Sequence, residues 1–156
     1  MEIISQILEK KGNQIHSVSP DTTVYDALKL MADKNIGAVL VLEGQKLCGI
    51  MSERDYARKI VLKGKSSKEV PVKEIMSSEV ICIDPDQSIT NAQSIMIQKR
   101  IRHLPVLNKG ELVGLVSIGD IVDAMLDDNK FVIDQLFTYI KGSPALGKEY
   151  LQQQKL

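Results

Sequence analysis

The sequence predicts an α/β protein that contains two copies of one small domain. When the 156-residue chain is laid over itself at an offset of 65 residues, residues 17–56 align with residues 82–121 without a gap. Twelve of these 40 aligned positions are identical, whereas about two or three matches are expected from ordinary composition. Each copy also carries the apolar patterns of a strand, a helix, a hairpin and a second helix in the same order. Coincidence is therefore excluded, and the chain is a tandem repeat.

Each copy is predicted to start with a short strand and a Pro-Asp pair, followed by a helix whose apolar residues recur at spacings of three and four. These residues are Val24, Ala27, Leu28 and Met31 in the first copy and Ile89, Ala92 and Met96 in the second. Two aliphatic runs separated by a turn then indicate a hairpin, over residues 38–51 and again over residues 104–116. Pro105 suggests a strand at a sheet edge. A helix is expected to follow each hairpin, from about Glu53 and from about Ile118.

We place the first domain, with an N-terminal helix, at residues 1–62 and the second domain at residues 72–127. Residues 63–71 form a linker, which the lysines of the 63–73 stretch predict to be solvated rather than a phosphate-binding strip. Residues 128–156 are expected to form a C-terminal helix and tail. The helix has an apolar stripe that covers core or a dimer surface and ends at residues 142–144, and the tail from residue 145 is expected to be poorly ordered. The stripe comprises Val132, Ile133, Leu136, Phe137 and Ile140.

Composition excludes several classes of function. Twenty Lys and Arg balance twenty Asp and Glu, so the chain lacks the basic footprint of a nucleic-acid-binding protein and the usual attraction to a membrane surface. Two cysteines and two histidines cannot supply a disulfide scaffold or a zinc site. The N-terminus does not resemble a signal peptide and no apolar run could span a membrane, so we expect a cytoplasmic protein in a reducing compartment.

Enzymatic activity is not expected. No histidine lies beside a candidate nucleophile in a recognised motif, and the sequence has no Gly-rich phosphate loop of the GxxxxGK[ST] type. Cys48 and Cys82 align with Val113 and Ser17, so both are interpreted as strand residues that pack as small apolar groups. We therefore expect no catalytic residue, no metal ligand and no required cofactor.

Two polar pairs occupy matching positions in the two copies, Ser52 with Asp55 and Ser117 with Asp120. Both pairs lie where a strand becomes a helix. One interpretation is a helix cap, in which the serine accepts a backbone N–H and the acid offsets the positive helix end. The other is a ligand site, in which the carboxylate accepts two hydrogen bonds from a cis-diol such as a ribose, while the serine and free N–H groups meet a phosphate. The two interpretations are compatible.

A cationic segment, Lys99-Arg100-Ile101-Arg102-His103-Leu104-Pro105, joins a predicted helix to a predicted strand. Lysine and arginine favour helix C-termini and often remain solvated there. Arg102 and His103, however, flank the start of an apolar strand, and their side chains could converge on an anion. Solvation and anion binding both remain open for this segment.

These residues carry a family resemblance. GIMSERD at residues 49–55 and GLVSIGD at residues 114–120 resemble the G-h-h-S/T-x-x-D signature of cystathionine-beta-synthase (CBS) domains. Two tandem copies resemble the CBS pair, or Bateman module, from about residue 3 to residue 127. The stretches SERDYARK and RIRHLPV further resemble stand-alone CBS-pair proteins of bacteria and plant organelles. The resemblance implies two α/β domains packed with pseudo-twofold symmetry, each a small sheet flanked by helices, with adenosine ligands bound in clefts between the repeats.

The resemblance also implies residue roles. In the first cleft, Asp55 would bind the ribose hydroxyls and Ser52 would lie near ribose or phosphate. Ile50, Val80 and Ile81 would surround adenine, and Arg102 and His103, followed by Pro105, would face the phosphate. In the second cleft, Asp120 and Ser117 would take the ribose roles, with Ile15, His16 and Leu115 near the base. Gly37 and Ala38 stand there at the positions that match Arg102 and His103, which puts phosphate binding in that cleft in doubt. His16 can equally be a strand residue without a ligand.

The first functional hypothesis is a non-catalytic sensor that binds AMP, ADP or ATP and signals occupancy to an unidentified protein partner. NADH and S-adenosylmethionine are further ligands that the resemblance allows, and it implies a homodimer. Two clefts that share residues would be coupled, and such coupling is reciprocal. The second hypothesis is a structural or protein-interaction module without a physiological nucleotide. In that case Asp55 and Asp120 would matter only as caps.

Overall fold

The structure is a computed structural model that describes residues 2–141, and these fall into two compact units. One unit, here called the sheet unit, comprises residues 13–83 and 105–115. The other, the helical unit, comprises the described parts of residues 1–12, 84–104 and 116–156. The chain thus passes from one unit to the other four times. The N-terminal helix belongs with the helices of the second repeat and not with the first repeat that follows it in sequence.

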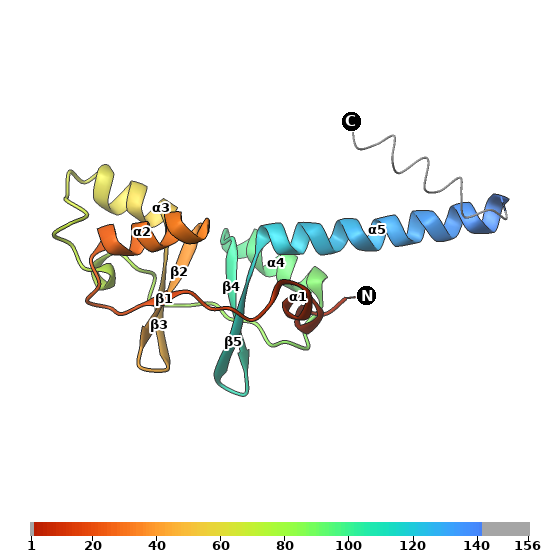
Figure 1. Cartoon of the computed structure of the whole chain (residues 1–156), viewed down its shortest axis with the longest axis horizontal. Coiled ribbons are helices and arrows are strands. Elements are labelled where there is room, and N and C mark those ends of the chain that lie inside the picture. Colours follow the sequence, from red (N-terminus) through yellow and green to blue (C-terminus); the bar gives the residue numbers. More distant parts are fainter. Residues whose placement is uncertain (1, 142–156) are drawn as a thin grey trace. The chain divides into compact units, whose positions relative to one another are not determined.

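The sheet unit is built on a three-stranded sheet in the order β1-β2-β3 (Figure 1). β1 (Ser17–Val18) runs parallel to β2 (Ala38–Glu43), and β3 (Lys46–Ser52) runs antiparallel to β2. Gly44 supplies the positive φ of 63° that the tight turn between β2 and β3 requires. Ala38 pairs with Ser52 at the far end of this hairpin. The predicted strand, helix and hairpin of the first repeat are therefore confirmed.

Helices cover the apolar face of this sheet. α2 (Val24–Lys34) starts at Thr23, whose hydroxyl accepts the Asp26 N–H at 3.1 Å, and it ends at Asn35 in the left-handed conformation. α3 (Glu53–Tyr56) continues into a π-helical turn, Ala57–Val61. Side chains from the helices, from β2 and β3 and from the segment after α3 pack into one core. Its buried members are Val24, Ala27, Met31, Val39, Val41, Met51, Ile60, Val70, Val72 and Ile75.

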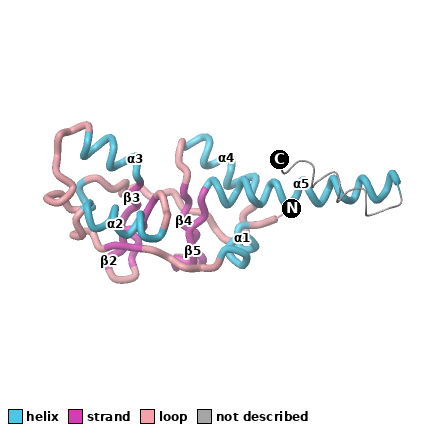
Figure 2. The backbone as a smooth tube through the Cα atoms, turned by 45° about the horizontal axis from the view of Figure 1, so that its top comes forward, coloured by secondary structure: helices cyan, strands magenta, loops and turns pink. Residues whose placement is uncertain are grey.

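The chain between α3 and α4 is mostly loop, drawn in pink in Figure 2, with one 3-10 turn at Val72–Glu74. The lysines of the predicted linker are exposed, as expected. The prediction of a solvated linker is wrong for Val70, which is buried, and Val72 at the start of the predicted second domain is buried as well. The physical reason is backbone pairing, because the Val24 N–H donates to the Val70 carbonyl at 2.9 Å and the Val72 N–H to the Thr22 carbonyl at 2.8 Å. These bonds hold both valines against the core.

Gly49 allows the segment after the linker to run against β3. The Ile50 N–H donates to the Ser77 carbonyl at 3.1 Å, and the Ser77 N–H donates to the Ile50 carbonyl at 2.9 Å. A Cβ atom at residue 49 would come within 2.5 Å of the Met76 sulfur and 2.9 Å of the Ser77 carbonyl oxygen. The glycine of the first signature is thus required by close backbone packing.

The helical unit contains α1 (Ile4–Lys11), α4 (Ile89–Lys99) and α5 (Ile118–Lys141). Backbone hydrogen bonds join the start of α1 to the segment before α4: the Ile4 N–H donates to the Gln87 carbonyl and the Ser5 N–H to the Pro85 carbonyl, both at 2.9 Å. The Ser88 hydroxyl caps α4 by accepting the Asn91 N–H at 3.1 Å. Apolar faces of the three helices meet through buried Ile4, Ile7, Leu8, Ile89, Ala92, Met96, Ile121 and Ala124.

The hairpin of the second repeat, β4 (His103–Asn108) and β5 (Glu111–Ser117), is present as predicted. The short strand expected before α4 is reduced to a single bridge between Ile83 and Val106. Pro105 faces this minimal pairing, and its carbonyl accepts the Ile83 N–H at 3.0 Å. This environment agrees with the expected edge position, because a proline has no N–H to donate to a continuing ladder.

α5 is one continuous helix of 24 residues and does not break near residue 128, where the sequence analysis placed a boundary (Figure 1). The helix packs on α4 and buries Ile121 and Ala124 in its first turns, while Val122, Leu126, Val132, Leu136 and Tyr139 are exposed. The predicted stop at residues 142–144 and the predicted tail lie outside the described residues. Within the described part of the chain, no helix is both long enough and apolar enough to cross a membrane.

Candidate functional site

The first Ser-x-x-Asp turn closes the end of β3 and begins α3. The Ser52 hydroxyl accepts the Asp55 N–H at 3.3 Å, and Asp55 Oδ2 accepts the Ser52 N–H at 2.9 Å and the Ser52 hydroxyl at 3.1 Å. This reciprocal arrangement is a capping box, which satisfies donors that a helix start leaves free. The capping interpretation is therefore confirmed for this pair. The Asp55 side chain retains 16% of its exposure.

A lysine joins this carboxylate from the same helical segment. Lys59 Nζ lies 3.2 Å from Asp55 Oδ1, one turn further along, and also donates to the Ile75 carbonyl at 2.8 Å. Lys59 belongs to the π-helical turn that follows α3, and such turns recur at functional sites. The ammonium group thus links the acidic turn to the segment after the linker. Sequence reasoning missed Lys59, although its i,i+4 spacing from Asp55 is a signal for an ion pair on a helix.

The second Ser-x-x-Asp turn has the same geometry at the start of α5. Asp120 Oδ2 accepts the Ser117 N–H at 2.8 Å, and the Ser117 hydroxyl accepts the Asp120 N–H at 3.2 Å. Here the lysine comes from a distant element, because Lys11 Nζ at the end of α1 lies 2.7 Å from Asp120 Oδ2. The two turns are therefore alike in their caps and differ in the origin of their cation. No sequence pattern indicates Lys11, which is 109 residues from its partner.

The loop before each hairpin is bonded to the turn after it. The Glu53 N–H donates to the Gly37 carbonyl at 3.1 Å in the sheet unit, and the Ile118 N–H donates to the Arg102 carbonyl at 2.8 Å in the helical unit. Ala38, next to Gly37, pairs with Ser52 across the hairpin. The structure thus brings Gly37 and Ala38 to the Ser52–Asp55 turn. It brings Arg102 and its neighbour His103 to the Ser117–Asp120 turn, with the Arg102 side chain exposed. These neighbours differ from the grouping that the resemblance implied, which placed Arg102 and His103 with Asp55.

His103 lies in a polar cluster of the helical unit. Burial lowers the pKa of its imidazole below the ordinary value of 6.5, the Asp120 carboxylate opposes this shift, and the charges of Lys11 and Arg102 add to it. His103 is therefore neutral at neutral pH, so Arg102 and Lys11 carry the positive charge of this cluster. A neutral imidazole can still donate one hydrogen bond and accept another.

The lowered pKa of His103 predicts a loss of stability in acid. Below about pH 6.5 the unfolded chain binds a proton at this residue that the folded chain does not, so the free energy of unfolding falls as the pH falls. Urea unfolding at about pH 7.5 and about pH 5.5 measures this effect. We expect the parent to lose more stability than His103→Gln between the two conditions. Equal losses in both proteins would show that His103 does not contribute.

The remaining candidate residues lie on β3, β4 and β5, before β1 and in the segment before α4. Ile50 is a partly buried residue of β3, paired with Leu40 and two residues before Ser52. Ile15 and His16 precede β1 and are partly buried, and the His16 carbonyl accepts the Leu40 N–H at 3.3 Å. Ile81 and Leu115 are also partly buried, and Pro105 is buried. No contact in the described structure assigns any of these side chains to a ligand.

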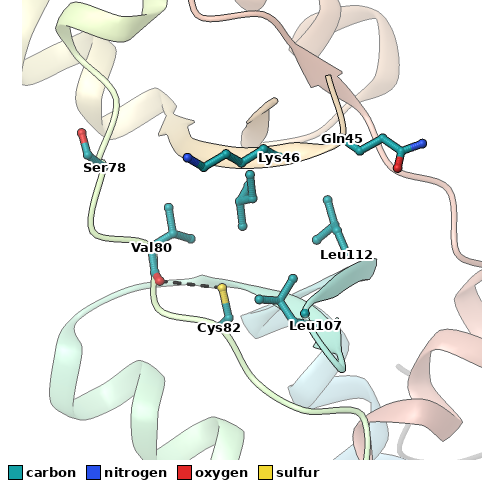
Figure 3. A pocket seen from close by; sticks show the side chains of 9 residues that line it. Gln45, Lys46, Ser78, Val80, Cys82, Leu107 and Leu112 are labelled. Atoms are coloured by element: carbon teal, nitrogen blue, oxygen red, sulfur yellow. Dashed lines mark hydrogen bonds between the residues drawn. The ribbon is translucent and has the colours of Figure 1, made fainter. Parts of the chain in front are cut away.

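Val80 lines a separate cavity of about 320 Å³ at the turn end of the hairpins (Figure 3). Lys46 and Leu47 at the start of β3 contribute to the wall, and Ser52 lies at the opposite end of this strand, about 20 Å away at the usual rise per residue. Val80 therefore lies away from the Ser52–Asp55 turn, although the family resemblance groups them. The full lining comprises Gln45, Lys46, Leu47, Ser78, Val80, Cys82, Leu107, Gly110 and Leu112.

Cys82 faces this cavity, and its thiol donates to the Val80 carbonyl at 3.7 Å, drawn as a dashed line in Figure 3. Burial raises the pKa of the Cys82 thiol. Since the thiolate is the nucleophilic form, the environment of Cys82 disfavours reactivity. Among the described residues, no cluster of histidine, cysteine and acidic side chains has a geometry that could hold a metal ion.

A duplicated strand, helix, hairpin and helix, with a capped Ser-x-x-Asp turn after each hairpin, is the arrangement of a tandem CBS-domain protein. The family model for the CBS domain matches this chain twice, at residues 4–62 and 72–127. The chain belongs to the CBS-domain family. The two matched ranges include both Ser-x-x-Asp turns. Proteins built only from a pair of CBS domains are in general regulatory or signal-transduction modules.

Individual relatives agree with this assignment. The mitochondrial CBS domain-containing protein CBSX3 of Arabidopsis thaliana is 39% identical over 148 residues, which cover 89% of this chain and 72% of that protein. The CBS domain-containing protein YhcV of Bacillus subtilis is 35% identical over 118 residues, covering 76% and 84%. A solved CBS-domain protein of Burkholderia ambifaria, with a suggested role in signal transduction, is 47% identical with a TM-score of 0.79, covering 81% of this chain and 96% of that one.

Proposed function

We propose that this protein is a non-catalytic regulatory module that binds adenine nucleotides of the AMP, ADP or ATP class and passes occupancy to a protein partner. The observation that carries the proposal is the pair of capped, partly exposed carboxylates, Asp55 and Asp120, at matching strand-to-helix turns. Each is held in place by backbone and side-chain hydrogen bonds before any ligand arrives. A fixed carboxylate of this kind is suited to a rigid vicinal diol, because little ordering of the site is needed on binding.

The carboxylates have capacity left for a ribose. A carboxylate offers about four acceptor positions. The turn and Lys59 occupy three of those at Asp55, and the turn and Lys11 occupy two at Asp120. Lysine is a flexible cation that can exchange one anionic partner for another. A cis-diol that donates to either carboxylate would therefore add to the site or displace the lysine, without disturbing the backbone bonds of the cap.

Arg102 supplies the positive charge that would distinguish nucleotides from nucleosides. Its side chain is exposed, while its backbone carbonyl is fixed by the Ile118 N–H at 2.8 Å. A guanidinium group binds phosphate through two parallel hydrogen bonds. NADH and S-adenosylmethionine also contain an adenosine ribose, and the proposal admits them as alternative ligands. No separate cofactor is needed for a module that acts by binding alone.

The capping boxes also support a second candidate, a protein-interaction module without a physiological nucleotide. In that case Asp55 and Asp120 serve only the caps that the structure shows. Asparagine at either position keeps an oxygen that can accept the serine N–H, so the interaction module would keep its partner binding after substitution. A nucleotide sensor would lose ligand affinity with the same substitution.

Calorimetric titration of the full chain with AMP, ADP, ATP, NADH, S-adenosylmethionine and adenosine tests the proposal. We expect saturable binding of a phosphorylated adenosine ligand in preference to adenosine, with up to two sites per chain. Absence of binding across all six compounds would contradict nucleotide sensing and would favour the interaction module. The same titrations would establish which ligand binds most tightly.

We also propose that the protein is a homodimer and that the exposed apolar side chains of α5 contribute to the contact. Val122, Leu126, Val132 and Leu136 recur at spacings of four, six and four along one side of this helix and are exposed. Large exposed apolar patches mark association surfaces.

The free cysteines Cys48 and Cys82 agree with a reducing compartment such as the cytosol, which we propose as the location of the protein.

The dimer proposal predicts that Leu136→Lys shifts the protein toward monomer. A lysine at this position places a charge in an apolar contact, and burial of an unpaired charge is unfavourable. Gln135→Lys adds the same charge at a neighbouring exposed position and is expected to leave assembly unchanged. Sedimentation velocity measures both variants. A parent protein that sediments as a monomer, or a dimer that Leu136→Lys leaves intact, would contradict this contact.

A further inference from the structure

The two acidic turns differ in the origin of the lysine that each one holds. Asp55 is paired with Lys59 on the same helical segment at a spacing of four residues. Asp120 is paired with Lys11, which is the last residue of α1. In the repeat alignment Lys11 corresponds to Met76, so the sequence symmetry supplies no such cation to the other turn. Lys11 is therefore a feature of one site only.

The Lys11 contact is close and its surroundings are cationic. Lys11 Nζ lies 2.7 Å from Asp120 Oδ2, and the two side chains retain 35% and 21% of their exposure. The same oxygen accepts the Ser117 N–H at 2.8 Å. The Arg102 backbone carbonyl accepts a hydrogen bond from the Ile118 N–H at the start of α5, which holds Arg102 beside this turn. The charges of Asp120, Lys11 and Arg102 all act on the pKa of the His103 imidazole. Two cations and a neutral imidazole thus surround one carboxylate.

We propose that Lys11 is a specificity-determining residue of the Asp120 site and that it binds the phosphate of a nucleotide whose ribose is held by Asp120. The proposal rests on the nucleotide binding proposed above. A ribose diol that takes the position of Lys11 on Asp120 Oδ2 releases the ammonium group from the carboxylate. A phosphate offers that group a doubly charged partner in exchange.

Lys11 adds a second cation to the turn that already holds Arg102. Gly37 and Ala38, which replace Arg102 and His103 in the repeat pattern, lie at the Asp55 turn instead. Lys11 comes from outside the repeat. A phosphate would give the Lys11 ammonium group a new anionic partner, which adenosine lacks. Lys11 should therefore increase the preference of this site for AMP over adenosine.

The contact between Lys11 and Asp120 also connects the ligand site to α1. The start of α1 is joined by backbone hydrogen bonds to Pro85 and Gln87, and its end carries Lys11 and then Gly12, whose φ of 89° ends the helix. Movement of Lys11 from carboxylate to phosphate would change the contact at one end of α1 while the other end stays fixed. Ligand occupancy at Asp120 would thus alter the N-terminal segment, and occupancy at Asp55 would not.

The test compares AMP with adenosine in Lys11→Met, using the full chain with Asp55→Asn to silence the other site. Methionine retains the length and apolar stem of lysine and removes its charge. We expect the ratio of AMP affinity to adenosine affinity to fall about tenfold or more, through weaker AMP binding with adenosine binding unchanged or tighter. Lys10→Met is the matched control, because Lys10 precedes Lys11 on α1 and pairs with Glu2 at 2.8 Å. This control is expected to keep the parental ratio.

The outcomes separate this inference from the proposed function. An unchanged ratio in Lys11→Met, with AMP binding that still depends on Asp120, would overturn the role of Lys11 and leave nucleotide sensing intact. Equal tightening of both ligands would show that Lys11 only blocks the carboxylate, and would also overturn the role. A parent chain that binds neither ligand would overturn both proposals. Thermal unfolding of the variant verifies that it is folded before the titrations are compared.

Discussion

Replacement of Asp55 by alanine is expected to lower AMP affinity at one of the two sites by about 100-fold or more. The substitution removes both acceptors for the ribose diol, and hydrogen bonds to a charged group contribute about 1.5–3 kcal/mol each. Two such bonds correspond to at least about 3 kcal/mol, or about two powers of ten in affinity. Calorimetry should therefore report a fall from two AMP sites to one, and Asp120→Ala should remove the other site.

The alanine variant also loses an acceptor of the Ser52 cap, which costs about 1 kcal/mol of stability. Asp55→Asn keeps an oxygen for the Ser52 N–H and loses the charge, so it should bind AMP poorly while remaining nearly as stable as the parent. Glu53→Ala removes an exposed carboxylate from the same helical turn and should leave AMP binding unchanged. Equal AMP affinity in the parent and in both Asp55 variants would refute the ribose role.

Arg102→Ala is expected to weaken AMP binding by about 10- to 100-fold and to leave adenosine binding nearly unchanged. The range follows from about 1.5–3 kcal/mol for a charge-assisted bond between guanidinium and phosphate, at 1.4 kcal/mol for each factor of ten. The Arg102 carbonyl, which holds the start of α5 through the Ile118 N–H, is kept in the variant. The effect should therefore be on the ligand and not on the fold.

Titrations of Arg102→Ala with AMP and with adenosine measure this difference. Lys99→Ala is the control, because Lys99 is an exposed cation in the last turn of α4, three residues away. It should change neither affinity by more than a small electrostatic amount. If Arg102→Ala weakens the binding of AMP and of adenosine equally, then Arg102 does not bind the phosphate and supports the site in another way.

Much of the fold could be predicted from the repeat itself. Apolar spacing located α2 and α4, and the Gly-containing turns located both hairpins, because these features are local and each repeat supports the other. The cap at Ser52 and Asp55 was also predictable, since a serine followed three residues later by an acid is a local signal. The short first strand was confirmed in one repeat and reduced to the Ile83–Val106 bridge in the other.

The parts that were missed depend on contacts between distant segments. Val70 and Val72 lie in a lysine-rich stretch, and only their pairing with residues 22–24 shows that they belong to the core. Lys11 meets Asp120 across 109 residues, with no counterpart in the repeat to suggest it. Val80 was grouped with the Asp55 turn by resemblance, whereas the structure places it in the cavity at the other end of β3. Local sequence patterns do not encode such contacts.

The central claim is that the two carboxylates bind a ribose diol. It is tested most directly by titrating the unmodified protein with AMP and with 2′,3′-dideoxy-AMP, which lacks both hydroxyl groups and keeps the base and the phosphate. We predict that the dideoxy compound binds at least about 100-fold more weakly, because two hydrogen bonds to a carboxylate are lost at each site. Equal affinity for the two compounds would contradict the claim and would leave Asp55 and Asp120 as helix caps alone.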